Sequence, residues 1–103
     1  MNGMCYYCWV IRSVRNAETK RLWLTGTSRR NPPPSLRRAA LRKLQLLDSA
    51  TRLEDMRAVP GNRFESLKGD RDGQFSIRIN VQYRICFTWK EGDAFEVEIT
   101  DYH

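Results

Sequence analysis

Residues 75–100 decide the fold, and they read FSIRINVQYRICFTWKEGDAFEVEIT. Apolar residues alternate with polar ones in three runs, at positions 75, 77 and 79, then 83, 85, 87 and 89, then 95, 97 and 99. Strict alternation rich in aromatic and β-branched residues predicts half-buried strands. The connections at 80–82 and 91–93 are short enough for hairpins. We therefore expect three antiparallel strands with one apolar face on a core and one polar face outward.

The residues before this stretch predict a fourth strand and a helical layer. Residues 63–67 read as a strand, and residues 9–14 as a short N-terminal strand that joins the sheet. Asn16 can cap a helix over 17–24, and Gly26 ends it. After three prolines, a second helix runs from 34 or 35 to about 50, followed by one helical turn with Leu53 and Met56 facing inward. Helices followed by strands predict an α+β fold.

The second predicted helix has two distinct sides. Its apolar stripe is Leu36, Ala40, Leu44 and Leu47, and its opposite side carries Arg38 and Arg42. The basic side belongs to a wider asymmetry, because residues 1–61 contain 12 Lys and Arg against 4 Asp and Glu, whereas residues 62–103 contain 6 against 8. A basic front half is typical of a protein with a polyanionic or acidic partner, and equally of a solvated helix surface.

The chain length of 103 residues predicts one domain, which we place at 10–103 after an N-terminal extension at 1–9. No stretch has the pattern of a signal peptide or a membrane span, so we expect a cytoplasmic protein. Three cysteines with uneven spacing indicate reduced thiols. Cys5 and Cys8 have metal-ligand spacing but lack two further ligands, and we expect neither a metal nor a cofactor.

Basic and titratable residues gather near the ends of the predicted strands. They are Lys68, Asp70, Arg71, Arg84, Asp101, Tyr102 and His103. Cleavage of RNA by its own 2′-hydroxyl needs a base, an acid and cations that neutralise the phosphorane, and His, Lys and Arg suit these roles. Each residue also has an ordinary interpretation: a charged turn at 68–71, a frayed C-terminus, and a cross-strand pair of Arg84 with Glu96 or Glu98.

Several segments together resemble the HigB-type toxins of the RelE-like family. They are LKGDR at 67–71, GQ at 73–74, SIRIN at 76–80, RICF at 84–87 and DYH at 101–103, with LLDSAT at 46–51 and PGNR at 60–63. The similarity covers about 10–103. It implies a RelE-like, microbial-RNase-type α+β fold and an endoribonuclease toxin that cuts mRNA in the ribosomal A site.

The resemblance also implies roles for individual residues. Lys68 and Arg84 would neutralise the scissile phosphate, His103 and Tyr102 would act at the ribose, and Asp101 would orient His103. Arg71, Arg78 and Tyr83 are candidate RNA-binding residues, with Tyr83 able to stack on a base. The charge of the second helix, rather than a motif, adds Arg38 and Arg42 as candidate contacts to ribosomal RNA. The chain departs from the family where Glu65 stands in place of a His that some members carry.

The implied partners are a HigA-type helix-turn-helix antitoxin, the ribosome and mRNA, with operator DNA reached only through the antitoxin and no membrane involved. Three other functions stay open. They are a binding module that has lost catalysis and regulates its operon, a ribonuclease that cuts naked RNA, and a protein that binds DNA by itself. The last is disfavoured because the sequence has no recognisable helix-turn-helix pattern.

Overall fold

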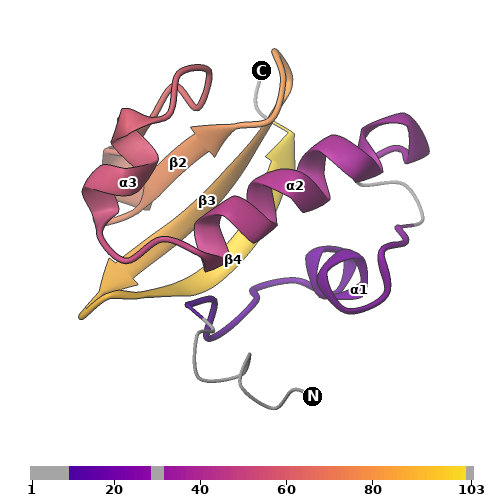
Figure 1. Ribbon diagram of the computed structural model, residues 1–103, viewed down its shortest axis with the longest axis horizontal. Coiled ribbons are helices and arrows are strands. Elements are labelled where there is room, and N and C mark those ends of the chain that lie inside the picture. Colours follow the sequence, from indigo (N-terminus) through magenta and orange to yellow (C-terminus); the bar gives the residue numbers. More distant parts are fainter. Residues whose placement is uncertain (1–9, 29–31, 102–103) are drawn as a thin grey trace.

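The computed structural model describes residues 10–28 and 32–101, and it has helices on one side of a four-stranded sheet (Figure 1). The helices are α1 (Ala17–Thr25), α2 (Arg37–Asp48) and α3 (Leu53–Ala58), with short 3-10 turns η2 (Pro34–Leu36) and η3 (Gly69–Arg71). The strands are β1 (Glu65–Ser66), β2 (Phe75–Arg78), β3 (Tyr83–Lys90) and β4 (Asp93–Asp101). They pair antiparallel in the order β1-β2-β3-β4. The α+β prediction is confirmed.

The first helix begins and ends where the sequence predicts. The Asn16 side chain accepts a hydrogen bond of 2.9 Å from the Thr19 amide, which satisfies an amide left unpaired at the helix start. Gly26 adopts a left-handed backbone with φ 78°, and its amide donates to the Leu22 carbonyl. The second helix begins later than expected, because residues 34–36 form the 3-10 turn η2 rather than its first α-helical turn.

The predicted N-terminal strand is much shorter in the structure. Residues 10–15 run parallel to β4, but only two isolated bridges join them, between Ile11 and Ala94 and between Val14 and Val97. The carboxylate of Asp48, at the end of α2, fixes this segment by accepting hydrogen bonds from the Val10 and Ile11 amides at 2.8 and 2.9 Å. The segment is therefore a tether along the edge of the sheet rather than a full fifth strand.

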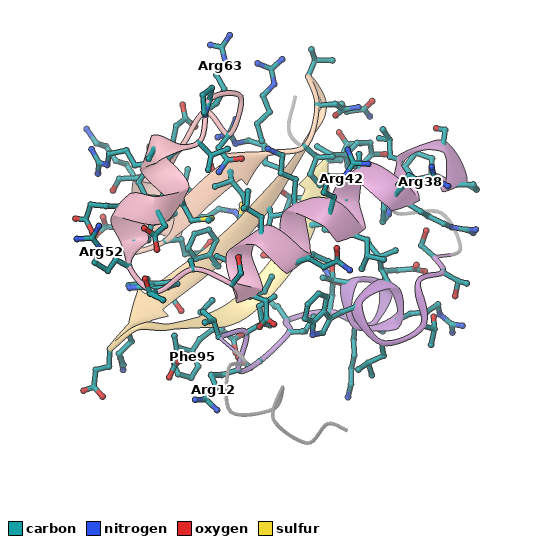
Figure 2. The ribbon with its side chains drawn as sticks, in the orientation of Figure 1. Arg12, Arg38, Arg42, Arg52, Arg63 and Phe95 are labelled. Atoms are coloured by element: carbon teal, nitrogen blue, oxygen red, sulfur yellow. The ribbon has the colours of Figure 1, made fainter. Side chains whose placement is uncertain are left out.

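The core lies between the helices and one face of the sheet. Ala40, Leu44 and Leu47 of α2 are fully buried, and Leu36 packs against them, so the predicted stripe faces inward. The sheet contributes Ile77, Ile85, Phe87, Val97 and Ile99. Met56 of α3 is buried and Leu53 packs on the same cluster, as the predicted extra turn requires. Arg38 and Arg42 are exposed on the outer side of α2 (Figure 2).

A β-bulge in β4 overturns one part of the predicted alternation. The register passes from Cys86 opposite Glu98 to Thr88 opposite Phe95, and Glu96 has a left-handed φ of 53°. The extra residue reverses the side-chain phase, so Ala94 rather than Phe95 faces the core. Phe95 is only half-buried and lies at the edge of the molecule in this view (Figure 2).

Candidate active site on the polar face of the sheet

The side of the sheet opposite the core, here called the polar face, brings together the candidate chemistry. Register partners share a face of a sheet. The pairs Ser76 with Cys86, Arg78 with Arg84, and Cys86 with Glu98 therefore lie on this face. The prediction that the polar face points outward is wrong for its centre, because Ser76, Arg84, Cys86 and Glu98 are all buried. A buried polar face needs internal partners for its charges.

Arg84 is at the centre of the site and is held in one orientation. Its Nε donates to the Ser76 hydroxyl at 2.8 Å, and its Nη2 donates to the Arg63 carbonyl at 2.5 Å. The Glu65 carboxylate lies 3.6 Å from Nη2 and is itself half exposed. Only 9% of Arg84 is exposed, so these contacts hold a largely buried guanidinium in place. A rigid fork of donors suits recognition of a phosphate.

The predicted pair of Arg84 with Glu96 or Glu98 does not form. Glu96 lies in the β-bulge and has no register partner on β3. Glu98 instead accepts a hydrogen bond from Arg71 Nη1 at 2.8 Å. Glu98 also lies 3.8 Å from Arg15 Nε and accepts a 3.4 Å hydrogen bond from Asn16. Arg71 further donates to Gln74 at 3.0 Å. Arg71 is therefore anchored to the sheet by a buried carboxylate.

Two further predicted cations, Arg78 and Lys68, lie on β2 and on the loop after β1. Arg78 is its register partner and is half-buried, with Nε donating to the Asn80 carbonyl at 3.1 Å in the hairpin turn. Lys68 precedes η3, is exposed, and makes no ion pair with any residue in the ranges 10–28 and 32–101. Its position three residues after Glu65 places a solvated ammonium on the loop that follows β1.

The buried Asn62 joins the helices to this part of the sheet. Its carbonyl accepts from the Arg78 amide, and its side-chain amide donates to the Met56 carbonyl at 3.0 Å. Its side-chain oxygen accepts from the ammonium of Lys43, whose pKa is lowered by burial. The next residue, Arg63, has a left-handed φ of 49° and supplies the carbonyl that holds Arg84. The PGNR segment at 60–63 thus positions Arg78 and Arg84.

The end of β4 brings Asp101 to the same end of the sheet as Arg84. Asp101 pairs in register with Tyr83, the residue before Arg84, and accepts a 3.1 Å hydrogen bond from Gln82. Tyr102 and His103 lie outside the described residues, so their predicted roles stay predictions. Tyr83 itself is 8% exposed and belongs to the core cluster, which leaves almost no ring surface for stacking on a base.

Cys86 lies on the same face and is fully buried, 3.6 Å from the Thr100 hydroxyl. Burial raises the pKa of this thiol, so it stays protonated and unreactive at neutral pH. Across the described residues, no three His, Cys, Asp or Glu side chains lie together as a metal site would require. In the same ranges, no helix has the length and apolar character that crossing a bilayer demands.

Two contacts of the site were not predicted from the sequence. Ser76 looks like an ordinary outward strand residue, and only the register with β3 shows that its hydroxyl supports Arg84. Glu98 looks equivalent to Glu96, and only the bulge separates them. One signal could have found Ser76. It lies opposite Cys86 on β3, and β3 is buried on both faces from Tyr83 to Phe87.

Comparison with known proteins identifies the class and then the family. The fold is shared with a chain of the YoeB-YefM complex from Staphylococcus aureus, with a TM-score of 0.54 and 15% identity over 90% of this chain and 97% of that one. A sequence model described as "RelE-like toxin of type II toxin-antitoxin system HigB" matches residues 12–103. The chain belongs to this family of HigB-like toxins.

Two curated relatives bear related names. Residues of this chain are 50% identical to Toxin HigB-1 of Vibrio cholerae serotype O1 over 62 residues, which is 60% of this chain and 65% of that toxin, just under two thirds of its length. Endoribonuclease HigB of Proteus vulgaris is 32% identical over 94 residues, which is 91% of this chain and 100% of that protein.

Proposed function

We propose that this HigB-like toxin is a cytoplasmic, ribosome-dependent endoribonuclease that cleaves translated mRNA in the A site and so stops growth. Its family and the name of its Proteus vulgaris relative support an endoribonuclease. The observation that carries the proposal is the fixed guanidinium of Arg84, held by Ser76 and the Arg63 carbonyl beside a second cation, Arg78. Such an arrangement suits a phosphate that gains charge during reaction.

In the proposed reaction, the 2′-oxygen of the RNA attacks the adjacent phosphorus and the bond to the 5′-oxygen breaks, leaving a 2′,3′-cyclic phosphate. Arg84 neutralises the phosphorane, and the exposed ammonium of Lys68 reaches the same phosphate from the loop after β1. Because Arg84 is preorganised, its hydrogen bonds to the phosphate need little rearrangement in the transition state. Lysine and arginine provide the positive charge, so the proposal is metal-independent.

The proposal assigns proton transfer to the residues at the C-terminal end of the chain. His103 follows β4 by two residues and has a side chain whose ordinary pKa of about 6.5 suits either proton role. Asp101 orients His103, and Tyr102 acts beside it at the ribose. Glu65, which stands where some family members carry a His, contacts Arg84 at 3.6 Å. A carboxylate at this place, Tyr102 or the ribosome supplies the second proton role.

Further RNA contacts come from basic residues outside the centre. Arg38 and Arg42 lie exposed along the outer side of α2, where they can meet ribosomal RNA (Figure 2). Arg78 is the register partner of Arg84, and Arg71 binds Glu98 on the same polar face. The buried ring of Tyr83 does not favour base stacking, so we assign this residue to positioning the end of β3. The proposed antitoxin is a HigA-type helix-turn-helix protein that also carries the complex to operator DNA.

The deciding experiment is induced expression of the wild type and of His103→Ala without antitoxin, with growth followed and mRNA 5′ ends mapped. We expect growth arrest with cuts in translated messages for the wild type, and neither for the variant. Purified toxin with naked mRNA, with and without a chelator, and with mRNA on intact ribosomes in Mg²⁺ buffer, then tests ribosome dependence; any cleavage of naked mRNA that survives the chelator needs no metal. Growth arrest without mRNA cuts would contradict nuclease activity and indicate that the protein blocks the ribosome instead.

The contact between Glu65 and Arg84 favours one alternative, a binding module that regulates its operon without catalysis. A carboxylate that stays on Arg84 would compete with the substrate phosphate for its donors. The same experiment separates the two functions, because a folded wild-type protein that neither arrests growth nor cuts mRNA would be the regulator.

A further inference from the structure

An open apolar groove lies beside β4, between the segment after Val10 and α1. Its volume is about 370 Å³, and its walls are the segment after Val10 and one side of α1, with Ile11, Val14, Trp23 and Leu24 as apolar lining. Leu24 is 66% exposed. Within residues 10–28 and 32–101, Leu24 and Val81 are the two large apolar side chains that are strongly exposed. Exposed leucine beside a half-buried tryptophan is typical of a binding surface.

The groove also has a backbone amide and a positively charged side chain that a partner could bind. Ile11 and Val14 bridge to β4 through the amides and carbonyls of their neighbours, so the Val14 amide points away from the sheet. That amide has no hydrogen-bond partner within 10–28 and 32–101. Lys20 stands at the rim without an ion pair in those ranges, and residues 10–28 carry four Lys and Arg against one Glu.

We propose that this groove binds an extended, acidic segment of the antitoxin with apolar residues at alternate positions. Its backbone would pair with the open edge at Val14, as an added strand does, and its apolar side chains would fill the space between Ile11, Trp23 and Leu24. Its carboxylates would face Lys20, which gives charge complementarity, and the apolar lining favours a peptide with apolar side chains. The inference rests on the proposed toxin function only for the identity of the partner.

The groove is separate from the predicted catalytic machinery. None of the residues that line it is a predicted catalytic or RNA-binding residue. The nearest link is Arg15, which follows the groove and contacts Glu98, the residue that anchors Arg71. Binding here therefore holds the antitoxin on the toxin without requiring that it fill the space in front of Arg84.

The test measures the affinity of full-length toxin for the antitoxin of the same operon by calorimetry. Leu24→Asp should weaken binding by about tenfold or more, and Lys20→Glu by about threefold to tenfold with a reduced salt dependence. Val81→Asp is the matched control, because Val81 is 80% exposed at the hairpin between β2 and β3, and it should stay within about twofold. Thermal unfolding checks that each variant is folded.

Cleavage of mRNA on ribosomes is measured for the same variants. Leu24→Asp should cleave like the wild type and escape neutralisation, whereas Arg42→Glu should lose cleavage but keep antitoxin affinity. Antitoxin affinity unchanged by Leu24→Asp, or absent from the wild type, overturns the groove proposal. Cleavage lost in Leu24→Asp with full antitoxin affinity assigns the groove to RNA and also overturns it. A wild type that does not cleave, with groove variants that still lose affinity, defeats only the proposed nuclease function.

Discussion

The two faces of β3 are made by alternate residues of one strand, yet they are stabilised in different ways. Ile85 and Phe87 face the helices and are fully buried among apolar side chains. Arg84 and Cys86 face the other way and are also buried, but each contacts a polar partner: Ser76 and the Arg63 carbonyl for Arg84, and the Thr100 hydroxyl for Cys86. The core face gains stability from removal of apolar surface from water, whereas the polar face must satisfy every group it buries.

This difference separates stability from function within a single strand. Apolar packing on the core face is non-directional, so it fixes where β3 lies but not what it can bind. The directional contacts on the polar face hold one guanidinium in place, which is what a phosphate site requires. Substitutions on the two faces should therefore have different signatures, and the predictions below test that separation in order of decreasing effect.

Ile85→Ala should produce the largest loss of stability, about 2–5 kcal/mol, because it leaves a cavity in the centre of the core. Urea unfolding followed by circular dichroism measures the loss. Val81→Ala is the control, since its exposed side chain should change stability by less than about 0.5 kcal/mol. A loss below about 1 kcal/mol for Ile85→Ala would contradict the assignment of this face as the main source of stability.

Arg84→Lys should act on function instead. It keeps the charge but loses the fork of donors, so we expect ribosome-dependent cleavage to fall about 10²–10³-fold. Cleavage rates on programmed ribosomes measure the effect, with Arg52→Lys on the exposed start of α3 as the control. Cleavage within about threefold of the wild type for Arg84→Lys would remove Arg84 from the site.

The sequence predicted the core face well because burial of alternate apolar residues is a local property. The stripe of α2, the cap at Asn16, the stop at Gly26 and the strand runs all follow from spacing within one element. The bulge at Glu96 was missed, since nothing in the alternation of residues 95, 97 and 99 marks the extra residue. One unpaired residue reversed the facing of Phe95 and Ala94.

The candidate site was predicted only in part, because its contacts join residues far apart in the chain. Charge and place near strand ends mark Arg84, Lys68 and Asp101, and the family resemblance gives them roles, yet the partners of Arg84 come from positions 63, 65 and 76. A pattern shows which residues share a face, but not whether a loop covers that face. Arg84 is held by the Arg63 carbonyl and Glu98 by Arg71, both outside the strands of the sheet, so these contacts could not be read from periodicity.

Glu98→Gln and Glu96→Gln sharpen the comparison, because the alternation treats the two glutamates alike. Glu98 is buried and binds Arg71 at 2.8 Å, so its neutralisation should destabilise the fold by about 1.5–3 kcal/mol. Glu96 is exposed on the bulge and should change stability by less than about 0.5 kcal/mol. Chemical denaturation of both variants at pH 7 measures the difference. Equal losses would mean that the Arg71 contact contributes nothing.

Cys86 provides the smallest predicted effect on stability. It is also the most direct test of whether water is excluded from the polar face. Burial raises the pKa of its thiol in the folded state, whereas in the unfolded chain a thiol ionises near its ordinary value of about 8.5. Between these two pKa values only the unfolded state loses the proton, so the unfolded state binds fewer protons and the free energy of unfolding falls as pH rises. The contribution is fully present below about pH 8 and is lost at higher pH.

The wild type should therefore lose stability more steeply than Cys86→Ala above about pH 8, by up to about 1.4 kcal/mol per pH unit. Urea unfolding at each pH measures both slopes. Cys5, Cys8 and all tyrosines and lysines are present in both proteins, so their titration cancels in the difference. The cavity in the variant shifts its curve at every pH without changing the slope. Parallel curves would show that water reaches Cys86 in the folded protein, and that the contacts around Arg84 are not shielded as the polar face requires.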